Sequence, residues 1–383
     1  TSAAVLPDIV REGTIPVNRQ ALLSSSVQAG FVVGALVVSI SGIADLLDPR
    51  RVLALSAFGA AACNATLIVA PLGSDLAITM RFMTGAFLAG VYPVGMKIAV
   101  GWGTSDRGFL VGLLIGALTF GKATPFLAAF VGGADWRLAI MITSLLAAIG
   151  GVCVLAAGLG PFHARAARFE VGAIRLAWTD RNIRRAYLGY LGHMWELFAM
   201  WPWIGAAAAV SYAQTLDQHS AESFAKLTAF LAIGAGAFAC VAAGKFADVV
   251  GKAEVTVVAL SASGLAAVLT AVTFGGPVWL TLVFVLIWGI FIIPDSAQFA
   301  AIVADHAPPH LVGSLLTFQT ALGFGLTIVI VQVTPIAADV FGWPVVLAGM
   351  AIGPAAGIVA MLPLTGRYMQ LRASREDAAG PRL

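Results

Sequence analysis

Charged residues are scarce in this chain. Asp, Glu, Lys and Arg together make up 11% of its 383 residues, whereas hydrophobic residues make up 60%. Because soluble domains carry roughly 25% charged residues, this balance excludes an ordinary water-soluble protein. The formal net charge is only +3, and the basic residues do not cluster on an amphipathic soluble segment. Nucleic acid is therefore not expected as a partner.

Cysteine and catalytic motifs are equally sparse. The three cysteines, Cys63, Cys153 and Cys240, each stand alone inside an apolar stretch, so neither a disulfide framework nor a metal site can be built from them. No phosphate-binding loop of the form G-x-x-x-x-G-K-[ST] occurs, which disfavours an ATP-driven pump. No nucleophile elbow or H-E-x-x-H occurs either. We therefore expect no enzyme activity, no cofactor and no metal.

Long apolar runs fill the chain instead. A helix crosses a bilayer with about 20 apolar residues. By that length we predict spans at 20–46, 52–72, 76–102, 109–131, 136–159, 186–213, 223–246, 254–274, 277–304, 314–340 and 343–366. Residues 1–10 resemble the tail of a further span, so the first helix is expected to be truncated. The prediction is an all-α membrane protein of about twelve helices.

The longest polar stretch, Pro161–Arg185, lies between the sixth and seventh predicted helices. We predict an N-terminal six-helix bundle at 1–160, a partly helical linker at 161–185, a C-terminal six-helix bundle at 186–368 and a tail at 369–383. Fifteen basic residues lie on the linker side of the spans and four on the other side. By the positive-inside rule the linker and C-terminus are cytoplasmic, and we expect a bacterial inner-membrane protein.

A loop pattern occurs twice. Ser41–Arg51 and Gly244–Lys252 each place an Asp at the end of one apolar span and basic residues shortly before the next. Asp45 and Asp248 are 203 residues apart, and Pro93 and Pro294 are 201 apart. This near-constant offset predicts two similar halves, as in secondary transporters.

Both loops resemble G-x-x-x-D-R-x-G-R-[KR], the loop motif of the major facilitator superfamily. The first copy departs from it at Ser41, Leu46 and Asp48, whereas the second keeps Gly244, Asp248, Gly251 and Lys252. Two further patterns are similar to those of the family's helices four and five; they comprise Arg81, Gly85 and Gly90, and Gly112, Gly116, Gly121 and Pro125. The resemblance covers essentially the whole chain.

The resemblance implies two bundles around a central cavity that opens to each side in turn. It also implies a latch between the halves, in which Asp45 pairs with Arg50 or Arg51, and Asp248 pairs with Lys252. The alternative is that these loop charges only set the topology. Lys97 lies near the cytoplasmic end of its span, where it either acts as a gate with Asp295 or reaches the interface.

Charges within the spans need a reason, because each costs about 2.5–3.5 kcal/mol at mid-bilayer on insertion scales. Lys122 lies too deep to reach the interface easily, which favours an anionic substrate group as its partner. The alternative is a structural pair with Glu196 or Asp295. Arg81 either contributes to the cavity or bonds to backbone carbonyls.

His193 and Glu196 are three residues apart and so share a helix face. Since His titrates near neutral pH, the two are candidates for carrying a coupling proton, together with Asp295 after Pro294. The alternative is a buried hydrogen bond that holds the helices together.

Further polar and aromatic side chains are candidates for lining the cavity. They are Tyr92, Trp195, Trp201, Gln298 and Gln319. The aromatic residues are alternatively part of the interfacial belt.

The charges within the spans are three basic and two acidic, which favours a small organic anion as the substrate, moved with protons. We expect a monomer in the lipid bilayer. Proton-antiport efflux of lipophilic or cationic compounds is the alternative within transporters. A receptor or assembly factor on the same fold is the alternative outside them.

Overall fold

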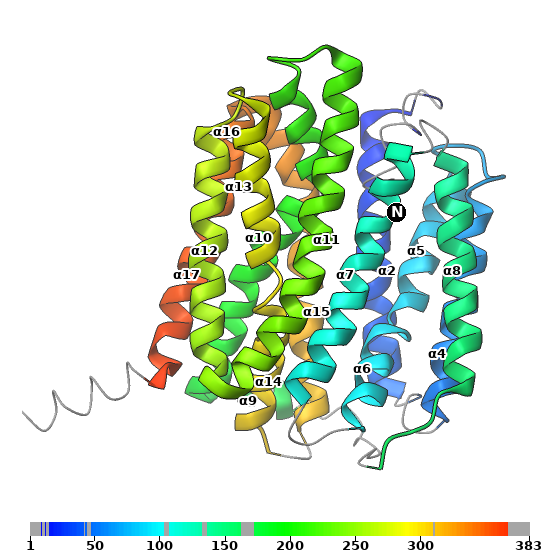
Figure 1. Ribbon diagram of the computed structural model, residues 1–383. Helices are drawn as coiled ribbons and strands as arrows, with labels where there is room; N and C mark the ends of the chain where they lie inside the picture. The colour runs from blue at the N-terminus through cyan, green and yellow to red at the C-terminus, as the bar shows by residue number, and fades with distance from the viewer. Residues whose placement is uncertain are drawn as a thin grey trace, which may run out of the picture.

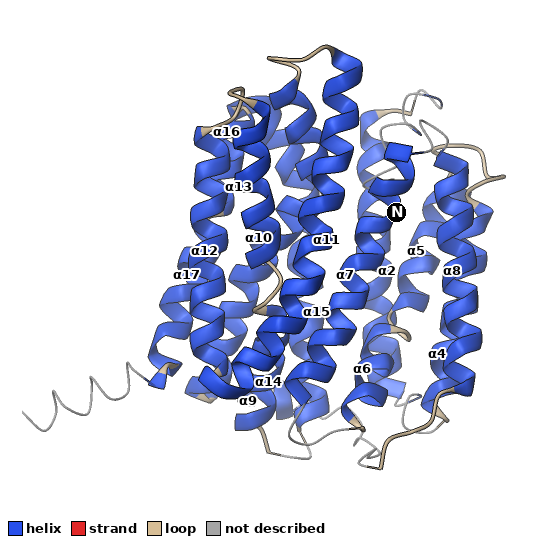
Figure 2. Ribbon diagram, in the orientation of Figure 1, coloured by secondary structure: helices blue, strands red, loops and turns tan. Residues whose placement is uncertain are grey.

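The computed structural model describes residues 15–41, 47–102, 107–131, 136–161, 172–308 and 311–366, together with Ile9, Glu12 and Ile43. These residues form helices and short connections, with no strand among them (Figure 2). Among the described residues, eight helices or interrupted helices are long and apolar enough to cross a membrane. Large apolar side chains are exposed along the outer faces, where lipid tails would cover them. The protein is an integral membrane protein with an all-helical fold.

The helices form two neighbouring groups (Figure 1). The first group comprises α2 (Val17–Ser41), α4 (Pro49–Thr66), α5 (Asp75–Leu88), α6 (Tyr92–Val100), α7 (Arg107–Val131) and α8 (Trp136–Ala156). The second group comprises α9 (Gly172–Thr179), α10 (Arg181–Tyr212), α11 (Gln218–Val250), α12 (Lys252–Val272), α13 (Val278–Phe291), α14 (Ser296–His306), α15 (Val312–Phe341), α16 (Trp343–Met350) and α17 (Ile352–Met361), followed by a short 3-10 helix at Leu362–Leu364.

Three predicted spans are interrupted rather than continuous. The span at 76–102 divides into α5 and α6, the span at 277–304 into α13 and α14, and the span at 343–366 into α16 and α17. Pro294 causes the second break because a proline ring has no N–H to donate and crowds the preceding turn. Val91, just before α6, and Ile292, just after α13, are 201 residues apart, so the two breaks repeat at the offset seen in the sequence.

The linker predicted at 161–185 ends earlier than expected. It contains the short helix α9, and α10 already begins at Arg181, because Asp180 caps that helix by accepting hydrogen bonds from the backbone N–H groups of Asn182 and Ile183. The predicted start at 186 was five residues late, since the charged first turn of α10 resembles a loop.

The two groups meet mainly along two helix pairs, α7 with α11 and α2 with α15, and α7 also contacts α14. A side chain at Gly116 would come 2.7 Å from the carbonyl oxygen of Ala237, so only glycine permits α7 to approach α11 this closely. At the other pair, Gln332 on α15 donates a hydrogen bond of 3.0 Å to the hydroxyl of Ser25 on α2. Side chains at these two seams are shared by both halves.

Candidate substrate and proton sites

Lys122 lies where the two halves meet. Its ammonium is 4.1 Å from the ring centre of Trp201 and 4.8 Å from that of Phe198, both on α10. The side chain is half-buried, and among the described residues no carboxylate forms an ion pair with it. The pairs with Glu196 or Asp295 considered from the sequence do not form. The charge is held by aromatic faces alone.

The two rings under Lys122 belong to a larger group that crosses between the halves. Phe198 makes an edge contact with Phe324 on α15 at 5.5 Å between ring centres, and Phe324 stacks on Phe31 of α2 at 4.1 Å. We call Phe31, Phe198, Trp201 and Phe324 the aromatic cluster. Tyr92, a predicted cavity residue at the start of α6, packs against the buried apolar group that contains Phe31. Lys122 is thus in direct contact with Trp201, and Tyr92 lies beside the Phe31 end of the aromatic cluster.

Three buried side-chain N–H groups have no hydrogen-bond partner among the described residues. They are the indole N–H of Trp201 and the amide nitrogens of Gln298 on α14 and Gln319 on α15. Trp201 is 7% exposed, Gln298 1% and Gln319 3%. Leaving a buried donor without an acceptor costs about 1–3 kcal/mol of stability. Binding of an oxygen atom to any of these groups would remove that cost.

His193 and Asp295 meet at the break between α13 and α14. The Nδ1 atom of His193 lies 3.0 Å from a carboxylate oxygen of Asp295, and its Nε2 atom lies 2.7 Å from the hydroxyl of Ser296. Both ionisable side chains are almost fully buried. The predicted pairing of Asp295 with Lys97 is replaced by this contact. His193 thus lies between a carboxylate and a hydroxyl at the helix break.

Glu196 occupies a separate buried position. One carboxylate oxygen accepts a hydrogen bond of 2.8 Å from the indole N–H of Trp288 on α13, and the other accepts one of 2.9 Å from the hydroxyl of Ser263 on α12. His193 and Glu196 therefore have different partners, although they lie one turn apart on α10. No basic side chain pairs with Glu196 among the residues that the structure describes.

Two predicted cavity residues lie away from Lys122. Arg81 is buried on α5 and donates a hydrogen bond of 3.4 Å to the backbone carbonyl of Leu23 on α2, which matches the structural alternative. Trp195 is 38% exposed and donates to the carbonyl of Gly349 at 3.3 Å, on the side of α10 that faces α16 and α17. Neither belongs to the aromatic cluster.

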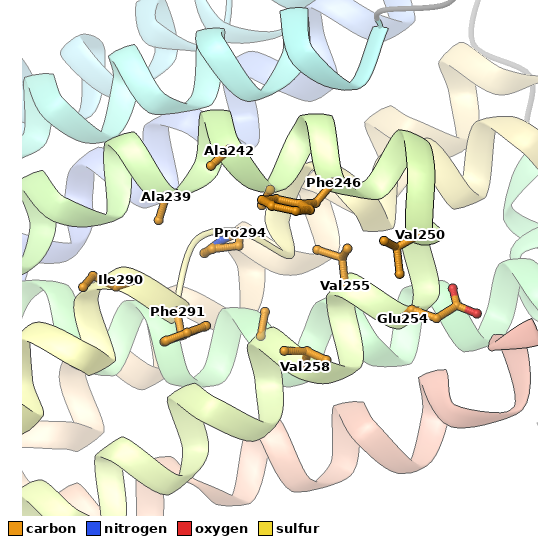
Figure 3. A pocket seen from close by; sticks show the side chains of 12 residues that line it. Ala239, Ala242, Phe246, Val250, Glu254, Val255, Val258, Ile290, Phe291 and Pro294 are labelled. Atoms are coloured by element: carbon orange, nitrogen blue, oxygen red, sulfur yellow. The ribbon is translucent and has the colours of Figure 1, made fainter. Parts of the chain in front are cut away.

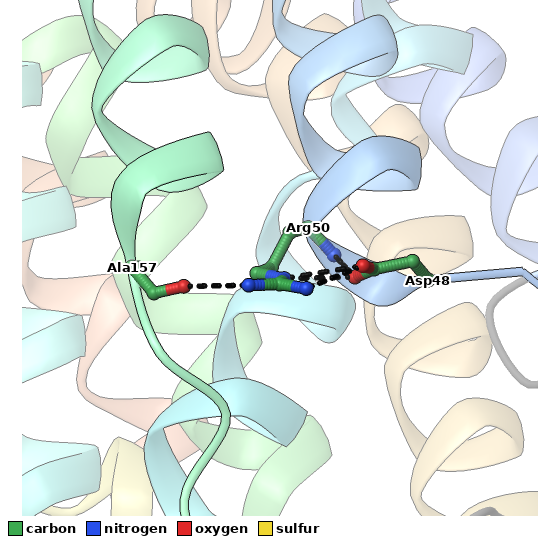
Figure 4. Close-up of polar contacts among 3 residues, drawn as sticks. All are labelled: Asp48, Arg50 and Ala157. Atoms are coloured by element: carbon green, nitrogen blue, oxygen red, sulfur yellow. Dashed lines mark hydrogen bonds and ion pairs between the residues drawn. The ribbon is translucent and has the colours of Figure 1, made fainter.

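The first predicted latch region forms contacts inside its own half. Arg50 pairs with Asp48 at 2.7 Å and also donates to the carbonyl of Ala157, just after α8 (Figure 4). The guanidinium of Arg50 lowers the pKa of Asp48, which also caps α4. Arg51 is exposed on α4. Asp45 lies outside the described residues.

The second predicted latch region also forms its ion pair inside its own half. Lys252 pairs with Asp305 on α14 rather than with Asp248, which is exposed on the last turn of α11. A contact that does cross between the halves at this end is the ammonium of Lys245 on α11, 5.0 Å from the ring centre of Phe109 on α7. Lys97 lies on α6, near the same end.

A pocket of about 470 Å³ lies on the outer face between α11, α12 and α13 (Figure 3). Its walls are almost entirely apolar, with Phe246, Phe291 and Pro294 among them and Glu254 at one end. It contains none of the predicted substrate residues, and lipid tails fit its chemistry. The described residues contain no cluster of His, Cys, Asp and Glu that could hold a metal ion.

Sequence reasoning missed several partners in these sites. Phe198 and Phe324 carry no polar atom, so nothing in the sequence distinguishes them from the other 20 phenylalanines. The spacing of Phe198 three residues before Trp201 was a usable signal, since such residues share a helix face. Ser263 and Ser296 gave no comparable signal.

Comparison with known proteins supports the fold. The Major Facilitator Superfamily model matches residues 1–330. The structure resembles the crystal structure of a variant of the E. coli fucose:proton symporter FucP with a TM-score of 0.65 and 14% sequence identity, covering 94% of this chain and 95% of that one. No curated protein sequence matches the chain. Because the family model covers most of its length, the chain belongs to the major facilitator superfamily and is a membrane transporter, not an enzyme.

Proposed function

We propose that this transporter moves a small organic anion together with protons, by alternating access, across a bacterial inner membrane. Lys122 binds the anionic group of the substrate, and His193 with Asp295 carries the proton. The linker and C-terminus face the cytoplasm, and the unit of transport is a monomer.

The observation that carries the proposal is the ammonium of Lys122 at the seam between the halves, where no carboxylate of the described residues neutralises it. A charge in such a low-dielectric position favours an opposite charge from the substrate. When the halves rock, a residue on α7 that contacts α10 changes its surroundings. Lys122 is thus positioned to bind the substrate more tightly in one state than in another.

Proton coupling is supported by the second buried group. His193 and Asp295 lie 3.0 Å apart at a helix break, and helix breaks near the membrane centre are where transporters commonly bind coupling ions. The similar fold of a fucose:proton symporter is consistent with coupling to protons. Glu196 lies on the same helix as His193, is a second buried acid besides Asp295, and serves as a further proton acceptor.

Efflux of lipophilic cations would place a carboxylate, not an ammonium, against the aromatic cluster. Glu196 instead accepts hydrogen bonds from Trp288 and Ser263, away from Lys122. The observations therefore favour the anion over the cation. Exchange and efflux modes remain outcomes of the experiment.

The test is transport by purified protein in proteoliposomes. With the inside alkaline, uptake of a radiolabelled organic anion should exceed that of empty liposomes and collapse when a protonophore is added. Lys122→Met should abolish uptake, whereas Lys226→Met, at the start of α11, should retain it. Uptake only of lipophilic cations, unchanged by Lys122→Met, would reject the proposal. A reconstituted, folded protein that moves none of these solutes would favour a receptor or assembly factor.

A further inference from the structure

We infer that the substrate is a planar monocarboxylate with an apolar body, bound at two points by Lys122 and the indole N–H of Trp201. This inference rests on the proposed anion transport and narrows it to one chemical class. Benzoate is the simplest member of that class. The supporting features are the donors, the rings and the count of charges at the seam.

Two donors lie close together at this site, the ammonium of Lys122 and the indole N–H of Trp201. The ammonium of Lys122 lies 4.1 Å from the ring centre of Trp201, so the ammonium and the indole N–H belong to one local group. That N–H is buried and has no acceptor among the described residues. A carboxylate has two oxygens, and one can face the ammonium while the other accepts from the indole. A neutral hydroxyl offers no charge to the lysine.

The neighbouring surface selects the body of the substrate. Besides the indole N–H of Trp201, the four rings of the aromatic cluster have no atom that can donate or accept a conventional hydrogen bond. Hydroxyl groups of a sugar would lose water there without gaining partners. A flat ring can stack or make edge contacts in the same way as Phe31, Phe198 and Phe324 already do with one another.

The charge count limits the substrate to one carboxylate. Among the described residues Lys122 is the one cation in contact with the aromatic cluster. Arg81, a buried cation of the same half, donates to the backbone carbonyl of Leu23 on α2. A second carboxylate would enter an apolar surface without a counter-charge, which disfavours dicarboxylates.

Thermal unfolding of the purified full chain tests this inference directly. Benzoate, cyclohexanecarboxylate, acetate, succinate, benzyl alcohol and benzyltrimethylammonium are compared at equal concentration and ionic strength. Benzoate should raise the unfolding temperature most and cyclohexanecarboxylate less, because only a flat ring can stack on the aromatic cluster. Equal shifts by these two compounds would overturn the requirement for a planar body. Trp201→Phe removes the N–H but keeps a ring under Lys122, so it should weaken benzoate binding about tenfold. Trp203→Phe is the matched control, because that indole donates to the carbonyl of Val331 instead.

The outcomes distinguish failure of the monocarboxylate inference from failure of the proposed anion transport. If succinate or acetate stabilises the protein as well as benzoate does, or if Trp201→Phe binds benzoate normally, the monocarboxylate inference fails and anion transport stands. If only benzyltrimethylammonium stabilises the protein and Lys122→Met does not reduce the effect, both fail. If the protein unfolds cooperatively and no compound shifts it, both fail as well. Trp201→Phe keeps the test decisive even where Lys122→Met does not fold.

Discussion

The two halves of the molecule hold opposite charges and satisfy them in different ways. Deep in the first half the ionisable side chains are basic, with Arg81 and Lys122 as the clearest cases. Deep in the second half they are Glu196 and Asp295 with His193. The acids are bound by donors of their own half, whereas Lys122 contacts rings of the opposite half.

This difference separates two tasks. A group whose partners all belong to one bundle keeps those partners while the bundles rock, so only its access to water and protons changes between the two states. A group whose partners belong to the other bundle loses them when the seam opens. In the proposed mechanism, Lys122 responds to the substrate, and the buried acids take up and release a proton.

The largest effect on transport is expected from removing the carboxylate of Asp295, a buried acid of the second half. Asp295→Asn removes the carboxylate beside His193, so uptake driven by a pH gradient should fall at least tenfold, while exchange of one anion for another continues. Both are measured in the same proteoliposomes. Asp305→Asn is the control, since that acid pairs with Lys252 near the helix ends. Undiminished gradient-driven accumulation by Asp295→Asn would remove this acid from the coupling mechanism.

Glu196 tests whether a buried acid of the second half also stabilises the fold. Glu196→Ala leaves the buried N–H of Trp288 and the hydroxyl of Ser263 without an acceptor, at about 1–3 kcal/mol for each unsatisfied group. Glu196→Gln keeps one acceptor oxygen and should lose less. Thermal unfolding of the purified variants measures both. Equal stability of the two variants would mean that these hydrogen bonds contribute little.

The helices themselves could be read from the sequence because the bilayer sets their length. Apolar runs of about 20 residues predicted the spans well, and Pro294 marked a break that the predicted span ran through. The start of α10 was missed because the arginines of its first turn resemble a loop. Bilayer length cannot fix helix ends that project beyond the apolar layer.

The site was harder to predict because it depends on which way each side chain points. Trp195 and Trp201 were grouped, yet six residues turn a helix by about 120° relative to a full number of turns, so they face different neighbours. Glu196 and Trp201, five apart, differ by about 140°. His193 and Glu196 share a face but meet different helices, and only the crossing of α10 with α12, α13 and α14 decides that.

Arg81 provides a smaller test, because it compares the two buried cations of the first half. Its hydrogen bond goes to the carbonyl of Leu23, so Arg81→Gln should retain a donor, lower stability by about 1 kcal/mol and change anion affinity less than twofold. Lys122→Met should abolish binding under the same conditions. Isothermal titration and thermal unfolding measure the two effects. A loss of affinity as large as that of Lys122→Met would assign Arg81 to the substrate site.

The smallest effect is expected at the start of α4 in the first half, where Asp48 pairs with Arg50. The pKa of Asp48 is lowered by that guanidinium, so the pair stabilises the fold above the usual aspartate pKa of about 3.9 and loses this contribution as the pH falls through the lower folded value. Asp48→Asn retains a side-chain oxygen for capping α4 and removes only the charge. At pH 7 it should lower the unfolding temperature by about 1 °C, since partly exposed ion pairs contribute little, and the difference should vanish in strong acid.

Arg50→Gln supplies the second arm of a double-mutant cycle for the same pair. If the ion pair carries the effect, Asp48→Asn should cost almost nothing once Arg50 is already replaced. An undiminished cost in that background would assign the stability to the helix cap alone. Either result leaves Lys122 as the buried cation that depends on the opposite half.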